Sequence, residues 1–187
     1  MKNILVGNGI NIQYDNENYT CKNIVLRVLT ELDEEDYPCE YIVDNPMLIK
    51  SYMGKLFLAA REALDGGLDK YPNCTAERKG LNDFKDRYKS KKKSLRIADI
   101  GFEDYYLIHD LLCHKTHTQN PEQYTIRESL KMAYFHSIYN RGKLNLLHKE
   151  YSLGLVDYLK SFDNIFTTNY DSNLESATGK KIYHIHG

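Results

Sequence analysis

Short apolar runs mark the two ends of the chain, and a long stretch of helical periodicity separates them. Residues 3–6, 165–168 and 182–185 carry β-branched and aromatic side chains in runs too short for a helix, which predicts three strands. Between the first two runs, apolar positions recur every three or four residues, as on one face of a helix. This period predicts helices at 23–32, 45–64, 102–117, 121–138 and 153–162.

Two stretches lack such a period. Residues 13–22 are polar, and we expect a loop there. In 68–99, breaks at Pro72, Asn73 and Gly80 predict a solvated segment with little regular structure. The basic residues of 85–96 could touch a nucleic-acid backbone, but a solvated face is the favoured interpretation, because no aromatic ladder accompanies them.

A strand followed by a glycine-rich turn opens the chain, as in nucleotide-binding α/β folds. We therefore predict an α/β fold: a Rossmann-like parallel sheet with a long helical insertion, residues 23–162, between the first strand and the Thr-Thr-Asn-Tyr-Asp strand. We expect Gly7 and Gly9 to permit positive φ and close approach of a ligand. Asp171 suits the N-cap of a short helix that ends at Gly179.

Polar residues follow each predicted strand. They are Asn8 and Asn11 after the first, Asn169 and Asp171 after the second, and His186 after the third. In a parallel sheet the carboxyl ends of the strands share one edge, so these side chains should line one crevice.

The same residues carry a family resemblance. Thr168-Asn169-Tyr170-Asp171, then Leu174-Glu175, then His186-Gly187 resembles the sirtuin core pattern Q-N-I-D-x-L-E…H-G, with His186 placed 17 positions after Asn169. The opening Val6-Gly7-Asn8-Gly9-Ile10-Asn11 resembles the sirtuin G-A-G-x-S loop, with Asn8 for Ala and Asn11 for Ser. These departures are similar to the divergent bacterial SIR2-like group, many of whose members are NAD-consuming antiphage proteins, and to AbiH-like abortive-infection proteins.

The resemblance implies that NAD is the substrate and that its nicotinamide–ribose bond is cleaved. On this pattern His186 is the general base, and Asn169 holds the ribose or the attacking water. His184 is the competing base, although strand alternation turns it away from Ile185. The expected contacts to the nucleotide come from Gly7, Asn8, Gly9, Asn11, Thr168, Tyr170 and Asp171.

Two functions from different classes follow. One is an NAD glycohydrolase (NADase) of antiphage defence, triggered by a phage-derived or partner protein. The other is a non-catalytic module that senses NAD or ADP-ribose. A protein deacetylase ranks third, because the four cysteines lack the C-x-x-C spacing of the sirtuin zinc module.

The resemblance also bears on domain organisation. The whole of 1–187 is expected to be one SIR2-like domain. In the sirtuin pattern the chain continues past this H-G motif, so we expect these residues to be the N-terminal part of a longer protein. An open edge on the strand 182–185 would favour a homo-oligomer.

Composition narrows the remaining classes. The net charge of −1 exerts no overall pull on nucleic acid or anionic membranes, and no run of about 18 apolar residues predicts a membrane span. Widely spaced cysteines indicate reduced thiols and a cytoplasmic protein. His109, Cys113 and His117 share a helical spacing, but two turns separate the outer pair too far for one zinc ion, so no metal is expected.

Overall fold

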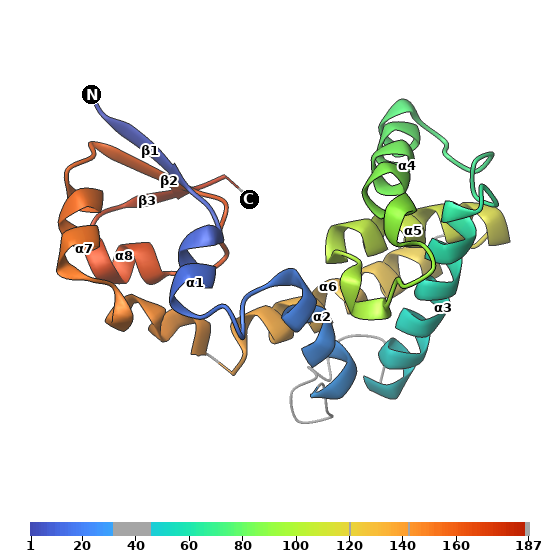
Figure 1. The fold of residues 1–187 in the computed structure, drawn as a ribbon, viewed down its shortest axis with the longest axis horizontal. Coiled ribbons are helices and arrows are strands. Elements are labelled where there is room, and N and C mark those ends of the chain that lie inside the picture. The colour runs from blue at the N-terminus through green and yellow to red at the C-terminus, as the bar shows by residue number, and fades with distance from the viewer. Residues whose placement is uncertain (32–45, 120, 142, 186–187) are drawn as a thin grey trace. The chain divides into compact units, whose positions relative to one another are not determined.

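The computed structural model describes residues 1–31, 46–119, 121–141 and 143–185 (Figure 1). The chain divides into two compact units, each described here by itself. The first combines Met1–Asn23 with Ile138–Gly187, and the second is Ile24–Ser137. Residues 138–162, part of the predicted insertion, thus belong to the first unit.

The first unit contains a small parallel sheet. Its strands are β1 (Asn3–Val6), β2 (Asn164–Thr167) and β3 (Ile182–His184), in the order β1-β2-β3. All three predicted strands are present, and the second begins one residue earlier than expected, so that Thr168 follows β2. Both pairs are parallel, which confirms a mixed α/β architecture with its three carboxyl ends at one edge (Figure 1).

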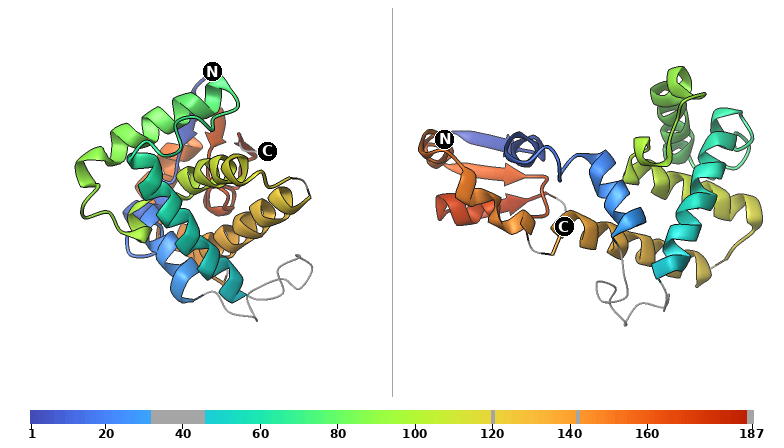
Figure 2. Two further views of the ribbon diagram at one scale, coloured as in Figure 1. Left: turned by 90° about the vertical axis from the view of Figure 1, so that its right-hand side faces the viewer. Right: turned by 60° about the horizontal axis from the view of Figure 1, so that its bottom comes forward.

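The two faces of the sheet differ in burial. Ile165 and Ile182, paired across β2 and β3, are buried on one face. On the other face Leu5 and Tyr183 are exposed on either side of Phe166, and the rings of Phe166 and Tyr183 stack at 5.3 Å. Helices α7 (Leu153–Lys160) and α8 (Asn173–Thr178) run along one side of the sheet (Figure 1 and Figure 2).

The structure confirms the predicted loop over 15–20 and shortens it at both ends, because residues 13–14 and 21–22 are helical. Helix α1 (Gly9–Tyr14) begins directly after Asn8, and α2 (Cys21–Thr30) begins within the predicted loop. Burial of Ile10 and Asn11 gives α1 a packed side that the polar sequence does not reveal. Gly7 and Gly9 do not use positive φ, because among described glycines only Gly66 and Gly179 do.

The second unit consists of packed helices. Besides most of α2, it contains α3 (Pro46–Leu64), α4 (Thr75–Tyr88), α5 (Phe102–Thr116) and most of α6 (Glu122–Tyr139). Short 3₁₀ turns lie at η1 (Lys89–Lys91) and η2 (Ile97–Asp99), and a third, η3 (Lys143–Glu150), belongs to the first unit. Among the described helices, none has the length and apolar character needed to cross a membrane.

Helix α4 corrects the prediction of an irregular segment at 68–99. The Cys74 side chain accepts a hydrogen bond from the Glu77 amide at its start, and Leu81 and Phe84 are buried along its inner face. Gly80 does not break the helix; the small residue lets Leu107 of α5 approach closely. Tertiary packing therefore outweighs the weak helix period of this stretch.

The basic residues of 85–96 are largely paired with acidic ones. Ion pairs join Lys85 to Asp69, Arg87 to Asp104, Lys89 to Asp86, Lys92 to Asp65 and Arg96 to Asp99. A surface neutralised in this way offers little net attraction to a nucleic-acid backbone.

Candidate functional site

The segment after β1 reaches the loop after β2 through Asn11. Asn11, on α1, donates from Nδ2 to Asp171 Oδ2 at 2.7 Å and to Asn8 Oδ1 at 3.3 Å. Asn8 in turn donates from Nδ2 to the Tyr19 carbonyl at 2.9 Å. Residues 160 positions apart in the sequence therefore meet at the carboxyl edge of the sheet.

Asp171 is buried and anchors the start of α8. Its Oδ1 accepts from the Asn173 amide at 3.0 Å, although Ser172 occupies the N-cap position that the sequence assigned to Asp171. Burial, and secondarily the Asp171 carboxylate, raises the pKa of Tyr139 and of Tyr151. The Asp171 carboxylate thus accepts its hydrogen bonds from neutral groups. Among the described residues, no Lys or Arg forms an ion pair with it.

Asn169 follows the central strand and is the least satisfied residue of this edge. Its main-chain amide donates to Thr167 Oγ1 at 3.0 Å, and that hydroxyl donates to the Val6 carbonyl at 3.0 Å. The residue is only 5% exposed, yet neither Nδ2 nor Oδ1 has a hydrogen-bond partner among the described residues. A buried amide left unpaired costs about 1–3 kcal/mol, so such groups are rare unless something else pairs them.

Other unpaired atoms belong to the same unit. Asn11 Oδ1, Glu175 Oε2 and Tyr151 Oη are buried and find no partner in the part of the chain that the structure describes. Among the described residues of the second unit, no buried side-chain nitrogen or oxygen is unpaired in this way. Among the described residues, buried side-chain polar atoms without a hydrogen-bond partner therefore occur only in the sheet-containing unit.

His184, at the end of β3, contacts both neighbouring elements. Its Nδ1 lies 2.9 Å from the Asn169 carbonyl oxygen, and its Nε2 lies 2.7 Å from Glu175 Oε1 on α8. The hydrogen bond to Glu175 raises the pKa of His184, against a smaller opposing effect of burial. The sequence pattern included Glu175 in its Leu-Glu motif but did not link it to this histidine.

The remaining predicted residues lie around this edge. A Cβ added at Gly7 would stand 3.4 Å from Thr168 Oγ1, so the first two strand ends are in close contact there. Gly9 faces open space, and Tyr170 is exposed, its carbonyl accepting from Tyr139 Oη at 2.6 Å. The predicted base His186, with Gly187, lies outside the described residues.

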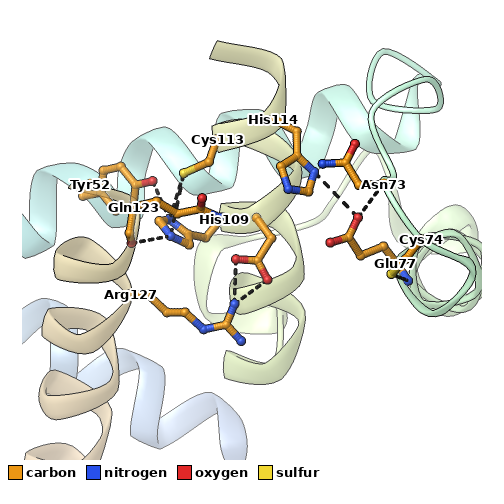
Figure 3. A network of polar contacts seen from close by, with 10 residues as sticks. Tyr52, Asn73, Cys74, Glu77, His109, Cys113, His114, Gln123 and Arg127 are labelled. Atoms are coloured by element: carbon orange, nitrogen blue, oxygen red, sulfur yellow. Dashed lines mark hydrogen bonds and ion pairs between the residues drawn. The ribbon is translucent and has the colours of Figure 1, made fainter. Parts of the chain in front are cut away.

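The histidines of α5 belong to a separate network in the second unit (Figure 3). Fully buried His109 lies between Tyr52 Oη, 2.8 Å from Nδ1, and the Gln123 carbonyl, 3.2 Å from Nε2. Burial lowers the pKa of His109 and raises that of the Cys113 thiol to about 11, which favours the neutral form of both groups.

Next to this network, a hollow of about 400 Å³ is bordered by Lys70, His114 and His117. His114 donates from Nδ1 to the Tyr71 carbonyl at 3.1 Å, which leaves it tied to the protein. Across the described residues, no group of three or more His, Cys, Asp or Glu side chains could hold a metal ion.

Comparison with family models, curated proteins and solved structures finds no match for this chain.

Proposed function

We propose that the carboxyl edge of the sheet binds NAD and that the protein is a SIR2-like NAD glycohydrolase acting in antiphage, abortive-infection defence. The observation that carries the proposal is the buried, unpaired amide of Asn169 at the end of the central strand. Its donor and acceptor together match a ribose hydroxyl, which can accept one hydrogen bond and donate another.

The charges of the described site support this ligand. Asp171 and Glu175 contribute two carboxylates, and the imidazolium form of His184 would offset one of them. The net negative charge that remains suits the cationic nicotinamide–ribose end of NAD. It also suits the positive charge that the ribose gains as the nicotinamide–ribose bond breaks. The same charge disfavours placing a phosphate beside Asp171, so the diphosphate would lie towards Gly7 and Gly9.

Within this proposal each residue has a role. Asn169 holds the ribose or the attacking water, and His186 accepts the proton. Asp171 and Tyr170 line the nicotinamide side, while Asn8, Asn11 and Thr168 shape the nucleotide pocket. No metal takes part in the reaction. The active form is a homo-oligomer, and a phage-derived or partner protein triggers its activity.

A specific observation favours the second function, a module that senses NAD or ADP-ribose without cleaving it. His184 faces two oxygen acceptors, so its nitrogens are engaged and neither is available as a general base. A site with this arrangement would bind the nucleotide without turnover unless His186 supplies the base.

Incubation with NAD, with chromatographic detection of nicotinamide, tests the proposal. We expect release that falls by roughly 10²–10⁴-fold in His186→Ala and is lost in Asn169→Ala. Asn82→Ala, at an exposed asparagine on α4, is the matched control and should retain full release.

Calorimetry with NAD separates the two functions. Binding that depends on Asn169 without any nicotinamide release would replace the enzyme by the sensing module. Absence of both binding and release would overturn the proposal.

A further inference from the structure

His184 ties the end of β3 to the two elements that precede it. One ring nitrogen meets the main-chain carbonyl of Asn169, and the other meets the carboxylate of Glu175. The contact distances, 2.9 and 2.7 Å, are those of well-formed hydrogen bonds.

Both of these partners are acceptors. A carbonyl oxygen and a carboxylate oxygen carry no proton to donate, so each ring nitrogen must donate one. Neutral histidine has a single N–H, and only the imidazolium can make both bonds. The observed geometry is therefore that of protonated His184.

The imidazolium fixes the backbone of Asn169 from one side. On the other side, the Asn169 amide is held by Thr167 Oγ1 at 3.0 Å. Two main-chain hydrogen bonds thus hold the residue whose side chain is buried and unpaired. When the ring loses a proton, its remaining N–H stays with the charged carboxylate of Glu175, the stronger acceptor, so the bond to the Asn169 carbonyl is the one lost. That loss would free the peptide group between Asn169 and Tyr170 and loosen the orientation of the amide.

We propose that protonated His184, held by Glu175, is a positioning residue for Asn169, and that ligand binding at this strand end weakens when His184 loses its proton. The ligand part of this inference rests on the proposed function. Among the described residues, the charged groups acting on the ring are the carboxylates of Glu175 on α8 and Asp171 in the β2–α8 loop. Both are negative, and both favour the imidazolium.

The direction of the pH effect follows from these charges. The pKa of His184 is raised above its ordinary value of about 6.5, chiefly by the bond to Glu175. The positioning is complete at lower pH and is lost as pH rises through the raised pKa. If only the protonated form is competent, apparent affinity falls about tenfold for each pH unit above that pKa.

A ligand-free NMR titration tests the positioning role. The Tyr170 amide nitrogen belongs to the peptide group whose carbonyl accepts from His184, so its resonance reports that bond. We expect the Tyr170 amide and the His184 ring to titrate with one midpoint above about 6.5. A Tyr170 resonance that does not respond during the His184 titration would overturn the inference.

Glu175→Gln tests the source of the effect. Glutamine has the same shape but no charge, so the midpoint of the His184 ring should fall. Its amide can donate to a deprotonated Nε2, which leaves the single N–H on Nδ1 for the Asn169 carbonyl, so the response of the Tyr170 amide should shrink. Glu150→Gln, at an exposed position of η3, is the matched control and should leave both unchanged. An unchanged His184 midpoint in Glu175→Gln would contradict the role of Glu175.

Calorimetry with NAD between pH 5.5 and 9 tests the coupling to binding. We expect affinity to follow the NMR midpoint in wild type and to lose its pH dependence in His184→Gln, while His148→Gln retains it. Affinity that is independent of pH in wild type would refute the coupling and leave the proposed function standing. Absence of binding at every pH would instead refute the proposed function, and the Tyr170 resonance alone would then decide the positioning role.

Discussion

Replacement of Asn169 by leucine should stabilise the protein and abolish ligand binding. Leucine has the same number of side-chain heavy atoms as asparagine and carries no polar group. Because both amide atoms of Asn169 are buried and have no partner among the described residues, the replacement removes an uncompensated desolvation penalty of about 1–3 kcal/mol. At about 2–4 °C per kcal/mol for a chain of this size, the melting temperature should rise by roughly 2–12 °C.

Asn173→Leu is the matched control because Asn173 is equally buried but fully paired. Its Nδ2 donates to the Leu144 carbonyl at 2.7 Å, and its Oδ1 accepts from the His148 amide at 3.0 Å. Leucine there would leave two protein groups unpaired and should cost roughly 2–6 kcal/mol. The same substitution should therefore shift stability in opposite directions at two positions four residues apart.

Urea unfolding and calorimetric melting, each with and without NAD, measure both effects. A ligand at 100 times its dissociation constant stabilises a protein by about 2.7 kcal/mol, and this gain should appear in wild type and vanish in Asn169→Leu. If Asn169→Leu lost as much stability as Asn173→Leu, the Asn169 amide would be paired in solution. The structural argument for a ligand at this position would then fail.

Three further results are expected. Phe84→Ala should lower the free energy of unfolding by about 3–5 kcal/mol in urea titration if α4 packs as described, and by almost nothing if 75–88 were a solvated loop. Asn11→Ala should cost about 1–3 kcal/mol, because it leaves buried Asp171 without its 2.7 Å donor; an unchanged urea midpoint would show that the hydrogen bond is absent. Burial lowers the pKa of His109, so the unfolded chain binds a proton at this position before the folded chain does. The free energy of unfolding should therefore decrease as pH falls below about 6.5. If His109→Gln showed the same dependence of stability on pH as wild type, another group would be its source.

Predictions from the sequence were most accurate where a residue's role depends on its neighbours in the chain. The runs at 3–6, 165–168 and 182–185 show their strand character in side-chain shape alone, and the structure places strands there within one residue. Gly179 likewise ends α8 in the left-handed conformation, as the sequence predicted. Local sterics decide these features, so a single stretch of sequence contains the information.

The α4 region shows where local patterns are insufficient. Gly80 and the charged residues of 75–88 weaken the helix signal, yet burial of Phe84 and close contact with Leu107 stabilise a helix there. The acidic partners that neutralise the basic residues come partly from other segments, such as Asp65 and Asp104, and no local pattern predicts these pairings.

The sequence by itself determined the strand positions, the mixed α/β class and the set of polar residues that follow each strand. Only the tertiary structure decided which of these residues meet: Asn11 with Asp171, and His184 with both Asn169 and Glu175. It also decided that the Asn169 amide is buried without a partner while that of Asn173 is satisfied. The physical reason is that hydrogen bonding and burial depend on distances between segments up to 160 positions apart, which are set by packing of the whole unit rather than by local sequence.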